Sequence, residues 1–107
     1  MDSDQYVIVL TTWPADGDVD PLAQQLVDER LAACVNILPP MRSVYRWQGA
    51  VEQADERQLL IKTTAARLPA LESRLRALHP YDVPEFLVLP IAQGSAAYLT
   101  WLSDSTK

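Results

Sequence analysis

Residues 34–64 read CVNILPPMRSVYRWQGAVEQADERQLLIKTT and predict one long β-hairpin, around which the other elements can be placed. A first strand is interrupted by Pro39-Pro40 and resumes over residues 41–47, which include strand-forming valine and tyrosine. Gln48-Gly49-Ala50 has the composition of a hairpin turn. Residues 51–64 then return as a long strand that is polar in its first half and apolar near its end.

A strand and a helix are expected on the N-terminal side of this hairpin. Residues 6–12 form a short, nearly continuous apolar run with β-branched members, which is typical of a strand buried on both faces. Asp20-Pro21 is typical of an N-cap followed by proline at the first helical position. Apolar residues continue at helical spacing, so an amphipathic helix is expected over about residues 20–32.

A second helix is expected after the hairpin, because leucine recurs three and four residues apart from position 68 to position 78. Pro69 fits its first turn, and His79-Pro80 ends it, since proline cannot continue the helical hydrogen bonding. Residues 85–91 are expected to form a fourth strand, and Pro90 places that strand at a sheet edge.

The chain closes with a short helix that opens at Gly94-Ser95. The predicted order is thus β-α-β-β-α-β plus a terminal helix, which is the ferredoxin-like pattern of the α+β class. In that topology the first and third strands are central, and the helices cover one face of an antiparallel sheet. Something must then cover the other face.

The composition is that of one small globular domain, residues 1–107, in which residues 1–5 are expected to form a disordered tail. No apolar run approaches the ~18–20 residues that a membrane span needs. The net charge of −5 argues against nucleic-acid binding, which needs clustered Lys and Arg. Cys34 is the one cysteine, so no internal disulfide can form and a cytoplasmic location is expected.

The length of the hairpin also predicts self-association. Strands of about thirteen residues reach roughly 40 Å, against a diameter of roughly 33 Å for a compact domain of this size. The overhanging part carries Tyr45 and Trp47, which are common in interfaces, and its strands offer backbone groups to a neighbouring subunit. The alternative is that Pro39-Pro40 folds the hairpin back over its own sheet.

Several polar residues are candidates for chemistry, each with a plainer alternative. Cys34 is either a thiolate ligand or nucleophile, or a small buried hydrophobe at the start of a strand. His79 shares the segment 79–85 with a tyrosine and two carboxylates, so it is either a ligand or proton carrier, or a helix C-cap. Lys62 either pairs with a carboxylate or points to solvent. Glu56 and its acidic neighbours are interpreted as solvated hairpin charges.

No motif supports enzymatic catalysis. GxSxG, P-loop and GxGxxG sequences are absent, and glycine totals three. Spacing along the sequence also provides no metal site, because no CxxC, HxxxH or carboxylate cluster accompanies Cys34. We therefore expect a binding protein that needs no cofactor for folding, rather than an enzyme.

Five blocks of sequence, in order, are similar to the CutA divalent-cation-tolerance family. The blocks are residues 31–36 (LAACVN), 43–49 (SVYRWQG), 61–63 (IKT), 79–85 (HPYDVPE) and 98–102 (YLTWL). This resemblance extends from about residue 7 to residue 103. It implies a ferredoxin-like subunit in a tight homotrimer, similar in structure to the trimeric PII proteins, and a link to copper and other divalent metal ions.

The resemblance also assigns positions to particular residues. It implies that one set of side chains lies near clefts between subunits: Cys34, Lys62, His79, Tyr81, Asp82 and Glu85. It places Tyr45, Trp47 and Trp101 at the trimer interface.

Departures from the family pattern concern the metal site. Thr11 and Leu78 stand where some members carry a cysteine and a second histidine that are associated with copper, and Asp82 stands where glutamate is commoner. A Cys-His-His site is therefore not expected. The resemblance leaves a weaker divalent-metal site that uses His79 with Glu85 and Cys34 from one or two subunits.

Three functions stay open at this point. The first is a homotrimeric protein of copper or divalent-metal tolerance, with His79 as the principal ligand. The second is a PII-like sensor that binds a small anion in the intersubunit cleft through Lys62 and backbone donors. The third is a structural assembly module that binds no ligand.

Overall fold

The computed structural model describes residues 2 and 5–107, which form five strands and three α-helices. In chain order these are β1 (Tyr6–Pro14), α1 (Asp20–Asp28), β2 (Cys34–Ile37), β3 (Met41–Trp47), β4 (Ala50–Thr64), α2 (Leu68–Leu78), β5 (Leu87–Pro90) and α3 (Ala96–Ser105). Of the expected N-terminal tail, residues 1, 3 and 4 lie outside the described part. Gln5 lies within it, and its carbonyl oxygen accepts a hydrogen bond from the Ala65 N–H at 2.8 Å.

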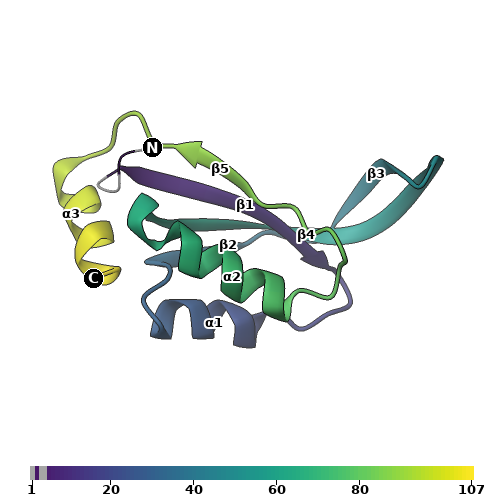
Figure 1. Cartoon of the computed structure of the whole chain (residues 1–107), viewed down its shortest axis with the longest axis horizontal. Helices are drawn as coiled ribbons and strands as arrows, with labels where there is room; N and C mark the ends of the chain where they lie inside the picture. The colour runs from purple at the N-terminus through teal and green to yellow at the C-terminus, as the bar shows by residue number, and fades with distance from the viewer. Residues whose placement is uncertain (1, 3–4) are drawn as a thin grey trace.

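The strands form one antiparallel sheet in the order β2-β4-β1-β5, and β3 pairs with the first part of β4 (Figure 1). β1 and β4 lie at its centre, as predicted for the first and third strands. β5 pairs with β1, so the edge position predicted from Pro90 is confirmed within this chain. β5 begins at Leu87 instead of residue 85, because Glu85 belongs to the preceding loop.

Helices α1 and α2 cover one face of the sheet (Figure 1). Alternate side chains of β1 and β4 point toward them, as the two-residue period of a strand requires. The strands and helices share one apolar core, whose fully or nearly fully buried members include Val7, Val9, Leu59, Ile61, Leu22, Leu26, Leu71 and Leu75.

Helix α1 is shorter than predicted at its C-terminal end. It ends at Asp28, and Arg30 adopts a left-handed backbone with φ of 59°. The Leu31 N–H then donates to the Leu26 carbonyl, and the Leu31 side chain is buried from this turn rather than from the helix. The N-terminal prediction is displaced by one residue, since Val19 occupies the N-cap position without a side-chain cap.

Helix α2 matches the prediction at both ends. A 3₁₀ turn, Ala65–Arg67, leads into it, and Pro69 lies in its first turn. His79 leaves the helix with an extended backbone while its N–H still donates to the Leu75 carbonyl at 2.8 Å. None of the helices in the described residues is long and apolar enough to span a membrane.

The β3–β4 hairpin projects from the body of the domain, as its length predicts (Figure 1). The molecule measures 44 × 26 × 24 Å along its principal axes, with the hairpin at one end of the longest axis. Pro39-Pro40 mark the break between β2 and β3, and both strands continue along β4 instead of folding back. Gln48 and Gly49 at the tip have φ of 51° and 82°, as in the two-residue turns that match strand twist.

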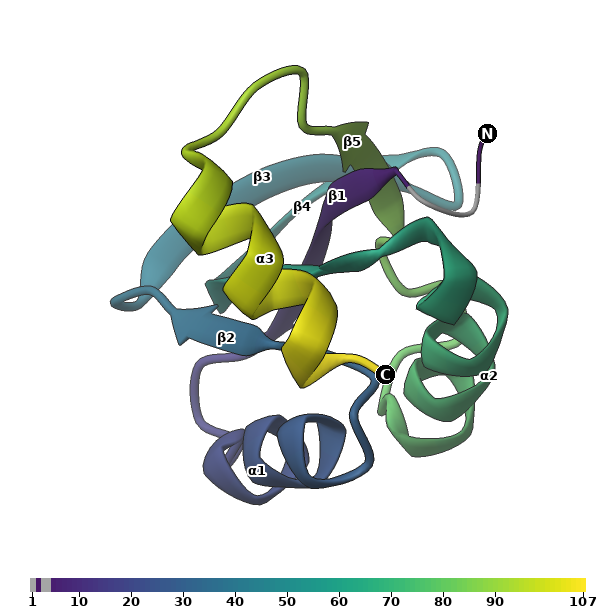
Figure 2. The same ribbon diagram turned by 90° about the vertical axis from the view of Figure 1, so that its left-hand side faces the viewer.

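Within residues 5–107, the other face of the sheet is covered at one end by α3 (Figure 2). There Lys62 Nζ lies 3.5 Å from the Tyr98 hydroxyl oxygen. Beyond α3, apolar side chains of the central and edge strands point away from α1 and α2, and we name them the open face: Ile8, Leu10, Leu60, Leu87 and Leu89. Leu87 and Leu89 are 53% and 46% exposed, so residues 5–107 do not supply the expected cover.

Candidate functional site

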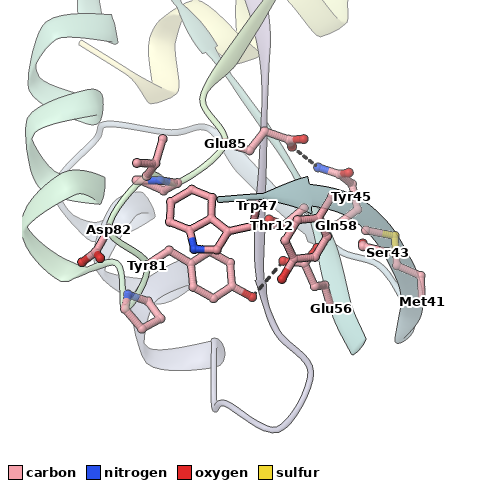
Figure 3. Close-up of a pocket in the computed structure, with 13 residues that line it drawn as sticks. Thr12, Met41, Ser43, Tyr45, Trp47, Glu56, Gln58, Tyr81, Asp82 and Glu85 are labelled. Carbon is pink, nitrogen blue, oxygen red and sulfur yellow. Dashed lines mark hydrogen bonds between the residues drawn. The ribbon is translucent and has the colours of Figure 1, made fainter. Parts of the chain in front are cut away.

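A hollow of about 790 Å³ lies where the hairpin meets the loop between α2 and β5 (Figure 3). Aromatic side chains of β3 and of the loop form its walls, namely Tyr45, Trp47 and Tyr81. Carboxylates also line it, namely Glu56 from β4 and Asp82 and Glu85 from the loop. The hollow therefore combines aromatic rings with acidic groups.

Strand alternation explains which hairpin residues face the hollow. Residues 41, 43, 45 and 47 share one face of β3, and all four line the hollow. Glu56 and Gln58 lie on the corresponding face of β4, opposite Met41 and Thr12 in the strand register. The loop opposite them is stiffened by Pro80 and Pro84, which restrict the backbone that carries Tyr81 and the acidic side chains.

His79 is held by two backbone hydrogen bonds behind the hollow. Its Nε2 lies 2.7 Å from the Thr12 carbonyl oxygen, and its Nδ1 accepts the Tyr81 N–H at 3.1 Å. These partners fit a neutral ring with its proton on Nε2. Burial lowers the pKa of His79, although the Thr12 carbonyl and the Glu56 charge act in the opposite direction. The ring also packs between aromatic neighbours, with centroid distances of 4.6 Å to Trp13 and 4.8 Å to Tyr81.

The Tyr81 hydroxyl connects this histidine to the acidic wall. It donates a hydrogen bond of 2.8 Å to Glu56 Oε2 (Figure 3). Burial, together with this bond and the Glu56 charge, raises the pKa of Tyr81 above its ordinary value. Tyr81 therefore remains a neutral donor. Glu56 is 8% exposed, so the interpretation of its carboxylate as a solvated hairpin charge was wrong.

Gln58 donates a hydrogen bond to the Glu85 carboxylate, as Tyr81 does to the Glu56 carboxylate. Its Nε2 donates to the Thr11 carbonyl at 2.8 Å and to Glu85 Oε2 at 2.9 Å. This bond fixes the loop carboxylate against β4 beside the hollow (Figure 3). Sequence reasoning missed both Glu56 and Gln58, although their even spacing with Leu60 places them on the face of β4 turned away from the helices.

A family model for the CutA1 divalent ion tolerance protein matches residues 7–105 of this sequence. The chain belongs to the CutA1 family. It is 52% identical over 99 residues to the divalent-cation tolerance protein CutA of Thermus thermophilus, over 92% of this chain and 96% of that relative. It is 48% identical over 101 residues to the CutA protein of Pectobacterium atrosepticum, over 94% of this chain and 92% of the relative.

The fold of this CutA1 chain agrees with a solved structure. The divalent cation tolerance protein (Cut A1) from Thermus thermophilus aligns with a TM-score of 0.91 at 50% identity, covering 95% of this chain and 99% of that one. The family resemblance inferred from the five sequence blocks is thus confirmed, as is the mixed α+β fold with an antiparallel sheet.

The predicted site residues of this CutA1 chain fall into two groups. His79, Tyr81, Asp82 and Glu85 lie in or behind the hollow. Cys34 and Lys62 lie elsewhere, opposite each other in the β2–β4 register.

Their distance from the hollow follows from the register of β1. Lys62 stands opposite Ile8, whereas the hollow begins at Thr12. Four residues of strand separate the two places by about 13 Å. Lys62 packs against α3, with its Nζ 5.8 Å from the Tyr98 ring centroid. Cys34 Sγ lies 3.7 Å from Asn36 Oδ1.

One chain therefore does not assemble the predicted metal site. Among the described residues, no group of three or more His, Cys, Asp or Glu side chains is arranged to hold a metal ion. The expected set of His79, Glu85 and Cys34 is divided by the sheet register. Both His79 nitrogens also have hydrogen-bond partners, so metal coordination by this ring requires the loss of one bond.

The charges of the hollow favour a cation over an anion. The charged residues that line it are Glu56, Asp82 and Glu85, and neither Lys nor Arg is among its lining residues. Lys62, the residue on which the anion-sensor hypothesis depended, does not line it. An anion in this hollow would meet like charge from three carboxylates, which is unfavourable at short range.

Proposed function

We propose that this CutA1 chain acts as a homotrimer in tolerance to divalent cations, binding the ion between ferredoxin-like subunits. The family assignment supports the link to divalent cations. The observation that carries the assembly is the open face, where Leu87 and Leu89 are exposed and Ile8, Leu10 and Leu60 are half-buried in the single chain. Large exposed apolar patches are typical of protein–protein interfaces.

The exposed aromatic residues support the same assembly. Tyr45 and Trp47 on the hairpin are 44% and 41% exposed, and Trp101 on α3 is 44% exposed. Aromatic side chains are enriched in interfaces because they bury a large area at low entropic cost. The projecting strand β3 also pairs with β4 on one side, which leaves its other edge available to a neighbouring subunit.

The candidate ligands Cys34 and Glu85 lie apart within one chain, but residues from two neighbouring subunits can meet at one site. Cys34 lies at the start of the edge strand β2, on the face of the sheet that carries the open face. Glu85 and Asp82 lie at the other end, beside the hollow. We propose that a thiolate from one subunit and carboxylates from another bind the ion, which suits copper or another divalent metal. His79 then positions the loop through Tyr81 rather than coordinating the metal.

Binding, and not catalysis, is the proposed activity. The family names describe tolerance of divalent ions and no reaction. We also propose a cytoplasmic location, where a single half-buried cysteine such as Cys34 stays reduced.

Calorimetric titration with Cu²⁺ and Zn²⁺ tests the metal-binding part of this proposal. Chelator-treated protein is expected to bind at least one of the ions saturably, and Cys34→Ser and Glu85→Gln are each expected to weaken that binding about tenfold or more. Glu72→Gln on α2 is the matched control, since this carboxylate is exposed and pairs with Arg76. Absence of saturable heat with both ions contradicts the proposal and favours a ligand-free assembly module. Saturable binding of equal affinity in all variants contradicts the proposed ligands and places the ion elsewhere on the protein.

A further inference from the structure

The Glu56 carboxylate is buried without a cationic partner. It is 8% exposed, and its hydrogen-bond partner is the neutral Tyr81 hydroxyl. The ion pairs of the described residues join Arg74 to Glu29, Arg76 to Glu72 and Lys107 to Asp104. A buried carboxylate is unfavourable unless a positive charge and further donors compensate it. The environment of Glu56 therefore lacks a cation.

The hollow in front of Glu56 has the walls that an organic cation requires. Tyr45, Trp47 and Tyr81 line it together with the Asp82 and Glu85 carboxylates (Figure 3). Ammonium and guanidinium groups are attracted to aromatic faces and to carboxylates. The same walls offer apolar surface to the alkyl chain that such groups carry.

The size of the hollow distinguishes an organic cation from a metal ion. Its volume of about 790 Å³ is within the range of pockets for small molecules, roughly 300–1,000 Å³. A metal ion needs several ligand atoms at about 2–2.6 Å, and the described residues offer no group of three candidate side chains so arranged. The acidic groups are spread around the hollow, as suits a ligand with separated positive charges.

We propose that the hollow binds a small organic cation, an alkyl amine or guanidine with more than one positive group, and that Glu56 is its principal counter-charge. Tyr45 and Trp47 enclose the alkyl part, and Asp82 and Glu85 neutralise the outer charge. This inference goes beyond the proposed function because it names a second class of ligand. Tyr45 and Trp47, which the proposed function also places between subunits, border the hollow where a neighbouring copy can close it.

An arginine side chain of a second copy carries the same kind of cationic group on an alkyl chain, so it could occupy the hollow in place of a free amine or guanidine. Arg42 and Arg46 lie on the exposed hairpin and alternate with the residues that face the hollow. If such a side chain compensates Glu56, the loss of the Glu56 charge weakens self-association and free amines do not bind. The experiment therefore includes both free amines and the mass of the protein in solution.

Calorimetric titration of the chelator-treated full chain with spermidine and agmatine, at constant ionic strength, tests the proposal. We expect saturable binding of one molecule per chain and no heat of binding with neutral 1,8-octanediol. Glu56→Gln keeps the size of the side chain and is expected to weaken amine binding about thirtyfold or more. Trp47→Leu is expected to weaken it about fivefold to tenfold. Glu72→Gln, which makes the same charge change on α2, is expected to bind as the parent does.

The outcomes separate this inference from the proposed function. No saturable binding of either amine, or equal affinity in Glu56→Gln and Glu72→Gln, overturns the inference. Loss of the oligomer in Glu56→Gln without amine binding assigns the counter-charge to a second copy and also overturns it. A monomer that still binds amines through Glu56 supports the inference and contradicts the trimer alone. If Glu56→Gln does not fold, Asp82→Asn at the exposed rim tests the same charge dependence.

Discussion

The Tyr81 hydroxyl donates a 2.8 Å hydrogen bond to the buried Glu56 carboxylate and thereby joins the loop after α2 to the base of the hairpin. The backbone N–H of the same tyrosine donates to His79 Nδ1, whose ring is fixed to β1 through the Thr12 carbonyl. Tyr81 and the His79 ring thus connect the loop after α2 with both β1 and β4. These bonds hold the loop that carries Tyr81, which forms one wall of the hollow, against β1 and β4.

Removal of the Tyr81 hydroxyl is expected to destabilise the protein. Tyr81→Phe leaves the Glu56 carboxylate without its donor, so the free energy of unfolding should fall by about 1–3 kcal/mol. Urea unfolding at a fixed chain concentration measures this change. Tyr98→Phe is the control, because that hydroxyl is exposed and lies 3.5 Å from Lys62 Nζ. Equal effects of the two substitutions contradict the importance of the Tyr81–Glu56 bond.

The stability of the protein should depend on pH through His79, its one histidine. Burial lowers the pKa of His79 in the folded protein, whereas the unfolded chain takes up the proton near pH 6.5. The unfolded state therefore binds more protons below that pH, so the free energy of unfolding is constant above about pH 7 and falls as pH decreases below about 6.5.

Urea unfolding midpoints between pH 5.5 and pH 8 measure this dependence. His79→Gln is the matched variant, since its side chain does not titrate, and its midpoint should change less over the same interval. A parent midpoint that stays constant down to pH 5.5 contradicts the prediction.

A charge on the open face should prevent self-association. Leu89→Glu replaces an apolar side chain that is 46% exposed in the subunit, so the folded chain should remain while the oligomer dissociates. Val27→Glu is the control, because Val27 is similarly exposed, at 42%, on α1 across the sheet. Light scattering and circular dichroism measure the two properties. An oligomer unaffected by Leu89→Glu shows that another surface joins the subunits.

The tip of the hairpin offers a stabilising substitution. Gln48 adopts φ of 51°, a region that asparagine tolerates better, and it precedes Gly49 with φ of 82°. Gln48→Asn creates the Asn-Gly pair preferred in such turns and should raise the free energy of unfolding by about 0.5 kcal/mol. Gly49→Ala should lower it, although open space surrounds that position, because its backbone conformation disfavours a Cβ atom. Thermal unfolding that does not distinguish the two variants contradicts this interpretation.

The arrangement of strands and helices was predictable because its signals are local. The apolar run of residues 6–12 indicates a buried strand, and the leucine spacing of residues 68–78 indicates a helix with one buried face. Pro90 indicates an edge strand, because proline cannot donate a backbone hydrogen bond to a second neighbouring strand. The end of α1 was not predictable from spacing, since Leu31 continues the apolar pattern but is buried from a turn. Periodicity of apolar residues predicts which side chains are buried, but it does not show whether the backbone at that position is a helix or a turn.

The candidate site was predictable only in part. The segment 79–85 was identified from its composition, and it does contribute to the hollow. Glu56 was missed because strand alternation shows the face on which a side chain lies, but not whether a distant loop covers that face. Cys34 and His79 were grouped through the family resemblance, whereas the strand register separates them within one chain.

The mass of the protein in solution shows whether chains assemble through the open face into a trimer. Light scattering during gel filtration should give about 36 kDa, the mass of three chains of 12.0 kDa, and the value should persist on tenfold dilution. A mass near 12.0 kDa at micromolar concentration rules out the trimer, because the open face would then be exposed to water in the monomer.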